Sequence, residues 1–187
     1  MEFATQCLHA GYEPQNGEPG ALPIIQSTTF KYDQTADVAA LFDLKAAGFF
    51  YSRLANPTVD AVERKLAALE GGVGAILTSS GQAASFIALM NLCHAGDHIV
   101  ASSTIYGGVI NLLAVTMKHF GIEVTLVDQS LPNAELDQYF RPNTKAFYAE
   151  SVANPSARVL DFARMAELAH SHGVPLVVDN TFATPYL

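Results

Sequence analysis

The sequence has few charged residues, few cysteines and no long apolar run, and each shortage excludes a class of protein. Only 15% of its 187 residues are charged, against about 25% in an average soluble domain. Its 10 Lys and Arg face 18 Asp and Glu, which gives a net charge of −8. An acidic chain with so few basic residues is a poor nucleic-acid binder, because that affinity comes from Lys and Arg neutralising phosphates. The two cysteines, Cys7 and Cys93, have no motif spacing and predict reduced thiols rather than a disulfide framework.

Membrane, export and metal signals are also missing. The most apolar windows, 83–93 and 109–117, are about half of the ~20 residues that a membrane-spanning helix needs. The opening residues, MEFAT, carry no basic region followed by an apolar stretch, so no signal peptide is expected. The closest pair of histidines, His170 and His172, is spaced i and i+2 at a predicted helix end, so the two side chains point to different faces and no metal site is predicted. We therefore expect a cytoplasmic protein with neither a membrane nor a nucleic-acid partner.

What the chain does have is apolar surface to bury, since 50% of its residues are hydrophobic. At this length a single domain can bury roughly 70% of its unfolded surface, so a core is available. The shortage of charge then predicts that part of the surface is covered, either by another protein or by sequence outside these residues.

The first 30 residues are punctuated by glycine and proline, which predicts an extended arm lying on a neighbouring subunit. A helix is expected near 35–47. The next helix has a clear start, because Asn56 is a good N-cap and Pro57 suits the first helical position; it ends at Gly71.

After this helix, short apolar runs alternate with helical stretches. The predicted strands are 73–78, 98–102, 122–127, 145–150 and 175–179, and the predicted helices are 82–94, 107–120, 134–140 and 161–172. Strands that alternate with helices and are apolar on both faces indicate a parallel sheet covered on each side. The fold class is therefore α/β, in one domain.

In an open parallel sheet the ligand lies beyond the carboxyl ends of the strands. The residues that follow the predicted strands therefore form one candidate rim, rich in hydroxyl groups: 79–82, 103–108, 128–129, 151–155 and 179–181.

Four features of this rim each have a chemical and a plain structural interpretation. Gly81 lets the backbone approach a phosphate at a helix start, although the turn could simply be a tight one capped by Ser80. Asp179 ends a buried strand, and its carboxylate needs a partner: a ligand's protonated ring nitrogen, a helix end or a cation. Tyr106 either stacks on a planar ligand or is an ordinary half-buried tyrosine. Asn154 either offers its side-chain amide to a ligand or simply belongs to a turn.

An anion cradle, a stacking ring and a carboxylate for a ring nitrogen together describe pyridoxal 5'-phosphate (PLP) better than a nucleotide. The glycines at 71, 72 and 74 lie before or at the start of their predicted strand, not after it, and lack the spacing of a dinucleotide fingerprint. The turn at 78–82 also lacks the G-x-S-x-G pattern of a hydrolase.

Several motifs, in order along nearly the whole chain, resemble the cysteine/methionine-metabolism family of PLP-dependent enzymes. They are YSR at 51–53, NPT at 56–58, LEGG at 69–72, SSGQAA at 79–84, YGG at 106–108, ESVANP at 150–155 and VDNT at 178–181. Within this family the segments at 5–11 and 23–29, with Gln82, are most similar to the O-acetylhomoserine sulfhydrylases. The resemblance implies the large domain of fold type I, with a mostly parallel sheet.

The resemblance also implies a role for each matching residue. Ser80, Gly81 and Gln82 would hold the cofactor phosphate, and Asp179 would pair with the ring nitrogen. Asn154 would bind the ring hydroxyl, and Thr181 would support the ring. Tyr106 would stack on the ring and act as the catalytic residue that assists proton transfer. Tyr51 and Arg53 would reach the phosphate of a neighbouring subunit, in a homodimer that shares its active sites and assembles into a tetramer.

One part of the family pattern is not found in these residues. The family attaches its cofactor to a lysine in a Ser-x-Thr/Ser-Lys motif roughly twenty residues after the counterpart of Asp179. None of the five lysines lies in that context: Lys31, Lys45, Lys65, Lys118 and Lys145. We expect residues 1–50 to form an arm and helix against a partner subunit and residues 51–187 to form the first part of the PLP-binding domain. The lysine and a C-terminal domain would then lie in sequence outside these residues.

The expected function is therefore that of part of an enzyme that makes homocysteine or methionine. It would replace the γ-acyloxy group of O-acetylhomoserine, an amino-acid substrate, with sulfide or a thiol. Alternatives within the family are a methionine γ-lyase and a cystathionine γ-synthase. Alternatives of another class are an inactive or structural assembly piece and, more distantly, a nucleotide-binding α/β domain.

Overall fold

The structure is a computed structural model that describes residues 2–187, and it divides into two compact units that meet between Leu77 and Thr78. The first unit contains α1 (Phe3–His9), α2 (Thr35–Phe42) and α3 (Pro57–Glu70). No helix among residues 2–187 is long and apolar enough to span a membrane.

The first unit is organised around α3, which begins where the sequence predicts. Asn56 accepts the N–H of Thr58 at 2.9 Å and donates through Nδ2 to the carbonyl of Ile25 at 3.0 Å, so the cap also holds the arm. Gly71 ends the helix in a left-handed conformation, with φ of 64°. Helix α1 packs against α3, where Lys65 Nζ donates to the carbonyl of Cys7 at 3.1 Å.

The first 30 residues are not extended throughout, because residues 3–9 form helix α1. The breakers in the sequence start only at Gly11, so nothing opposes a helical turn before it. Gly11 itself has φ of 87°, and a Cβ there would lie 2.2 Å from the carbonyl oxygen of Ala61. The helix predicted at 35–47 is shorter, ending at Phe42, and Leu44 takes a positive φ of 55°.

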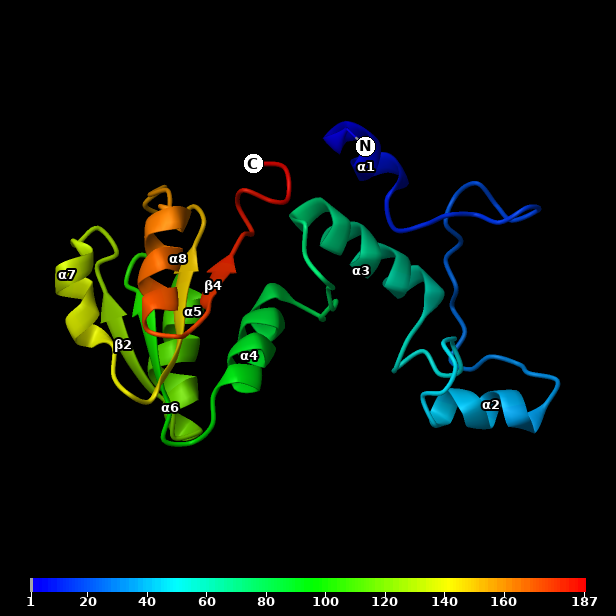
Figure 1. Cartoon of the computed structure of the whole chain (residues 1–187), viewed down its shortest axis with the longest axis horizontal. Coiled ribbons are helices and arrows are strands. Elements are labelled where there is room, and N and C mark those ends of the chain that lie inside the picture. The colour runs from blue at the N-terminus through cyan, green and yellow to red at the C-terminus, as the bar shows by residue number, and fades with distance from the viewer. Residues whose placement is uncertain (1) are drawn as a thin grey trace. The chain divides into compact units, whose positions relative to one another are not determined.

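The second unit is a parallel α/β sheet, as predicted. Its strands are β1 (His98–Ser102), β2 (Glu123–Val127), β3 (Thr144–Glu150) and β4 (Leu176–Asp179), in the spatial order β2-β1-β3-β4 (Figure 1). Its helices are α4 (Gly81–Leu92), α5 (Gly107–Asn111), α6 (Met117–His119), α7 (Asn133–Leu136) and α8 (Phe162–Ser171). A π-helical segment, η1 (Leu112–Thr116), joins α5 to α6. A short 3₁₀ helix, η2 (Asp137–Tyr139), follows α7.

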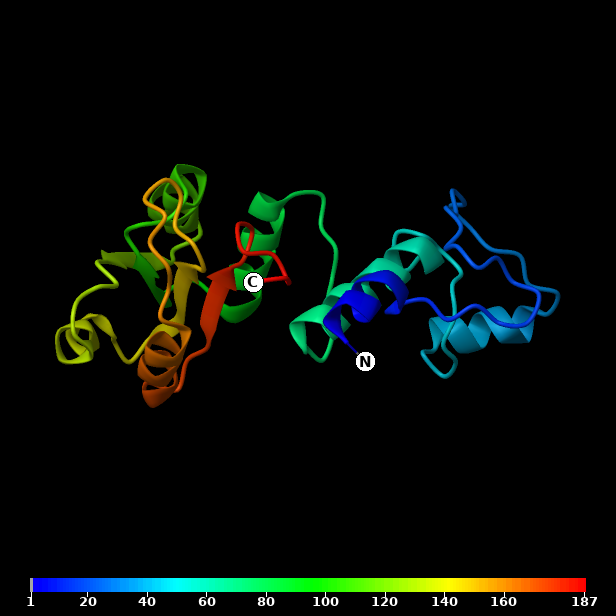
Figure 2. The ribbon, with the colours of Figure 1, turned by 90° about the horizontal axis from the view of Figure 1, so that it is seen from above.

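The sheet is covered on both faces (Figure 2). Alternate strand residues such as Ile99 and Tyr148 pack with α4 and with the α5–α6 segment. Their neighbours, such as Val100 and Phe147, pack with α7 and α8. This two-sided burial explains why the strands read as continuous apolar runs rather than as alternating patterns.

The prediction of a strand at 73–78 is wrong, because this segment forms no strand. Val73 is fully exposed and Ile76 is 84% exposed. A strand exists only where a neighbour accepts its backbone hydrogen bonds, and no strand among residues 2–187 pairs with this segment. The N–H of Leu77 is bonded instead to the Glu63 carboxylate at 2.8 Å.

His98 is a buried polar link at the start of the sheet. It has no exposed surface; Nδ1 lies 2.9 Å from the Thr144 hydroxyl on β3, and Nε2 lies 2.9 Å from the Thr125 hydroxyl on β2. Burial lowers the pKa of His98 below 6.5, and the nearby Arg141 charge lowers it further. The neutral imidazole is therefore the form that joins the three strands.

We predict that His98 makes the fold sensitive to acid. Because its pKa is lower in the folded than in the unfolded chain, its contribution is complete above pH 6.5 and is lost as the pH falls towards the lowered value. The difference in unfolding free energy between the wild type and His98→Asn, measured by urea denaturation, should shrink below pH 6.5. His119→Gln, at an exposed histidine, is the matched control. A constant difference for His98→Asn across this range would contradict the prediction.

Candidate active site

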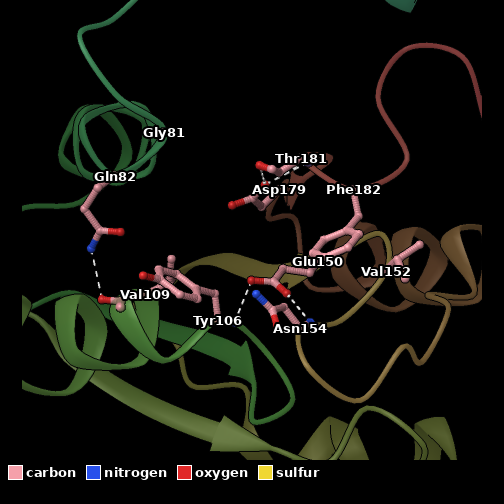
Figure 3. A pocket seen from close by; sticks show the side chains of 11 residues that line it. Gly81, Gln82, Tyr106, Val109, Glu150, Val152, Asn154, Asp179, Thr181 and Phe182 are labelled. Atoms are coloured by element: carbon pink, nitrogen blue, oxygen red, sulfur yellow. Dashed lines mark hydrogen bonds between the residues drawn. The ribbon is translucent and has the colours of Figure 1, made fainter.

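A cavity of about 460 Å³ opens at the carboxyl ends of β1, β3 and β4, within the second unit (Figure 3). Eight of its lining residues belong to the predicted rim: Gly81, Gln82, Tyr106, Gly108, Val152, Asn154, Asp179 and Thr181. The other three are Val109, Glu150 and Phe182. The strand order explains the grouping, since β1, β3 and β4 are neighbours and their turns leave the sheet at one edge.

The start of α4 forms one wall of the cavity. The Ser80 hydroxyl accepts the N–H of Ala83 at 3.1 Å, so Ser80 caps the helix, which is the plain alternative to a ligand contact. The N–H groups of Gly81 and Gln82 belong to the first turn of α4, where a helix has no internal acceptor for them. These donors and the positive end of the helix dipole suit a phosphate.

Tyr106 and its loop form the opposite side. The tyrosine is 52% exposed, and Figure 3 shows its ring facing the cavity. A Cβ added at Gly108 would lie 2.4 Å from Cε1 of the Tyr106 ring, so the ring lies where only glycine leaves room for it. The side-chain amide of Gln82 donates to the Gly108 carbonyl at 3.0 Å, which ties the start of α4 to the tyrosine loop.

Asp179 supplies a carboxylate at the end of β4. One of its oxygens, Oδ1, accepts the N–H of Thr181 at 3.0 Å and also its hydroxyl. Thr181 therefore orients the carboxylate, and Figure 3 shows the Asp179 side chain beside the cavity. The sequence argument that a strand-end carboxylate needs donors is confirmed in this respect.

Tyr148 lies beneath this carboxylate on β3 and is almost fully buried, with its hydroxyl 3.0 Å from that of Ser85 on α4. Burial raises the pKa of Tyr148 far above its ordinary value, and the neighbouring carboxylates of Asp179 and Glu150 raise it further. The tyrosine is therefore a neutral support of the site rather than a base.

Two groups of residues that the sequence singles out lie elsewhere. Asp128 and Gln129 follow β2, the edge strand farthest from β4, and they do not line the cavity. Tyr51 and Arg53 belong to the first unit, where the Arg53 guanidinium lies 5.1 Å from the centre of the Tyr51 ring. Their role at a neighbouring subunit's phosphate stays a prediction.

Sequence reasoning missed Glu150, Val109 and Phe182 as lining residues. Glu150 had a usable signal, because it is a charged residue at the end of an otherwise buried strand, as Asp179 is. The apolar residues had none, since nothing distinguishes them from core residues in the sequence.

Comparison with known proteins bears directly on this cavity. The family model described as "Cys/Met metabolism PLP-dependent enzyme" matches residues 4–187. The chain belongs to this family. The earlier resemblance, and PLP as the family's cofactor, are thereby confirmed.

Named relatives agree on a narrower group. A homocysteine/cysteine synthase of Kluyveromyces lactis is 46% identical over 96% of this chain and 41% of its own length. An O-acetyl-L-homoserine sulfhydrylase of Leptospira meyeri is also 46% identical, over 98% of this chain and 41% of its own length. The chain thus spans about two fifths of the length of these curated relatives.

The fold agrees with solved structures. A putative O-acetylhomoserine (thiol)-lyase of Campylobacter jejuni, with a pyridoxyl-lysine phosphate at one position, matches with a TM-score of 0.93 and 37% identity over 100% of this chain and 46% of its own. A cystathionine γ-lyase of Lactobacillus plantarum, complexed with L-serine, matches with a TM-score of 0.87 and 36% identity over 100% of this chain and 46% of its own.

The residues around the cavity fit PLP. Phosphate donors at the start of α4 and a carboxylate at the end of β4 lie on separate elements, with an aromatic ring that Gly108 leaves room for. No lysine lines the cavity among the described residues, so these residues would supply only non-covalent contacts to the cofactor.

We predict that Gly108→Ala weakens PLP binding up to about tenfold, the range expected for losing one favourable aromatic contact. The new methyl group would displace the Tyr106 ring, which can rotate away at little cost to the fold. The adjacent Gly107→Ala is the matched control, because a Cβ there meets no atom within 4 Å. Spectroscopic titration with PLP measures both affinities, and equal affinities for the two variants would contradict the prediction.

Proposed function

We propose that this chain forms the cofactor-holding part of an O-acetylhomoserine sulfhydrylase-type enzyme. The reaction is replacement of the γ-acetoxy group of O-acetylhomoserine by sulfide or a thiol, which releases acetate and gives homocysteine or methionine. The observation that carries the proposal is the cavity with phosphate donors from α4, the Tyr106 ring and the Asp179 carboxylate around one space. The sulfhydrylase and homocysteine synthase names of the relatives support the choice of substrate.

Each residue then has a defined task toward the cofactor. Bound PLP supplies an electron sink for the amino acid attached to it. The N–H groups of Gly81 and Gln82 hold its phosphate, and the negative charge of Asp179 keeps the ring nitrogen protonated. Asn154 holds the ring hydroxyl, and Thr181 keeps Asp179 in place through its two hydrogen bonds. The Tyr106 ring covers one face of the cofactor, and its hydroxyl assists proton transfer at the substrate.

The assembly is part of the same proposal. Residues 1–50 lie against a partner subunit, and Tyr51 and Arg53 reach that subunit's phosphate site in a dimer that pairs into a tetramer. The cofactor-binding lysine and the C-terminal domain correspond to the part of the relatives that these residues do not match. A cytoplasmic location stays a prediction.

A lyase or cystathionine synthase of the same family is the second candidate, because the structural likeness extends to a protein described as a cystathionine γ-lyase. The L. plantarum cystathionine γ-lyase and the MetB protein of Corynebacterium glutamicum match with TM-scores of 0.87 and 0.90. The direct test is to supply the protein containing this chain with PLP, O-acetylhomoserine and sulfide. Homocysteine is the expected product, whereas 2-oxobutyrate without homocysteine would favour the lyase. Absence of both products would favour the inactive, structural alternative.

We predict that Asp179→Asn lowers the rate of homocysteine formation by roughly 10²-fold, as removal of one preorganised electrostatic partner does. The neutral amide fills the same space but leaves the ring nitrogen without its counter-charge. Asp128→Asn is the matched control, since Asp128 follows β2 as Asp179 ends β4 but does not line the cavity. A comparable loss in both variants would show that the effect is not specific to the cavity.

A further inference from the structure

Glu150 lies in the cavity wall and binds two turns of the site at once. It is the last residue of β3 and only 5% exposed. Its Oε1 accepts the N–H of Tyr106 at 2.6 Å, and its Oε2 accepts the N–H of Asn154 at 3.0 Å (Figure 3). One buried carboxylate thus joins the loop that follows β1 to the loop that follows β3.

The two turns are those that carry the proposed ring contacts. Tyr106 is the residue before α5, and Asn154 lies four residues beyond Glu150 in the turn after β3. Neither side chain is itself engaged by Glu150, since both bonds come from the backbone. Hydrogen bonds to an ionised acceptor are short and strong, so they fix the main-chain positions from which both side chains extend.

Glu150 differs in this from the neighbouring Asp179. The two residues are cross-strand partners in the β3–β4 register, which places two negative charges side by side, an arrangement that is unfavourable unless each is compensated. Glu150 is compensated by the protein's own N–H groups on both oxygens. The donors that Thr181 gives to Asp179 both reach a single oxygen. The pair therefore divides its tasks: Asp179 faces the ligand and Glu150 holds the frame.

We propose that Glu150 is a positioning residue that sets the separation of the Tyr106 ring and the Asn154 amide, and hence the orientation of the cofactor ring between them. This inference rests on the proposed function for its consequence, but the link between the two loops is a property of the chain itself. Its charge matters as well as its size. A glutamine would keep one acceptor oxygen and turn an NH₂ group towards the other backbone N–H.

The test compares Glu150→Gln with Glu123→Gln. Glu123 is an exposed glutamate at the first position of β2, whereas Glu150 is at the last position of β3. Amide hydrogen exchange is measured first on the cofactor-free protein, in peptides that contain Tyr106 or Asn154. Exchange at one or both amides should accelerate by about tenfold or more in Glu150→Gln, as expected for losing a hydrogen bond to a charged group. It should be unchanged in Glu123→Gln. Protection retained at both amides in Glu150→Gln would overturn the proposal.

The second measurement uses bound PLP. At saturating cofactor, the induced circular dichroism per bound PLP should change in Glu150→Gln and not in Glu123→Gln, because it reports the orientation of the ring. The dissociation constant of PLP should rise about tenfold. An unaltered dichroism signal would overturn the positioning role even if the affinity fell.

A double-mutant cycle separates positioning from a general loss of stability. If Glu150 acts through the two side chains, Glu150→Gln should change PLP affinity by less than about twofold when Tyr106→Ala and Asn154→Ala are already present. An equal loss in both backgrounds would show that it acts by another route. Should Glu150→Gln not fold, Glu150→Asp keeps the charge but is one methylene shorter; it should retain protection at one amide and lose it at the other, and full protection at both would count against the proposal.

Failure of the proposed function gives a different pattern. A wild-type protein that neither binds PLP nor forms homocysteine would refute that function, whereas the hydrogen-exchange result on the cofactor-free protein would still decide whether Glu150 joins the two loops.

Discussion

The parallel pairing of β1, β3 and β4 is the constraint on which the site depends. In this register Ala101 pairs with Tyr148 and Glu150 pairs with Asp179, so the three strands end near one another. Tyr106, Asn154 and Asp179 reach the cavity because the sequence places them at or just beyond those ends, while the start of α4 adds the phosphate donors. A shift of β4 by one residue would turn Asp179 to the other face of the sheet and remove the carboxylate from the cavity.

Compensation of charge is the second condition for such a site. Two carboxylates at adjacent strand ends would repel each other in a buried setting. Backbone N–H groups from two turns satisfy Glu150, and Thr181 satisfies one oxygen of Asp179. A protonated ring nitrogen is the positive partner that we propose for Asp179.

Much of this could be predicted from the sequence, because it depends on local rules. Asn56 and Pro57 start α3 as expected, and the alternation of apolar runs and helices places four of the five predicted strands. Prediction failed where the answer depends on a neighbour in space. The segment 73–78 has strand composition but no strand beside it, and Asp128 lies outside the cavity only because β2 is at the far edge. The two N–H donors of Glu150 come from turns that only the folded sheet brings to it.

The low charge content also has a physical account. Among residues 2–77 only Leu41, Asn56 and Ala61 are buried, while apolar side chains such as Leu44 and Val73 are exposed. An apolar surface of this kind is typical of segments that pack against other protein, which supports the proposal that a partner subunit covers the arm.

A crystal structure of the protein containing this chain with PLP bound would test the central claim most directly. The account predicts the phosphate at the N–H groups of Gly81 and Gln82, the ring against Tyr106, and the ring nitrogen within hydrogen-bonding distance of the Asp179 carboxylate. PLP bound elsewhere, or bound here with its ring nitrogen away from Asp179, would contradict it.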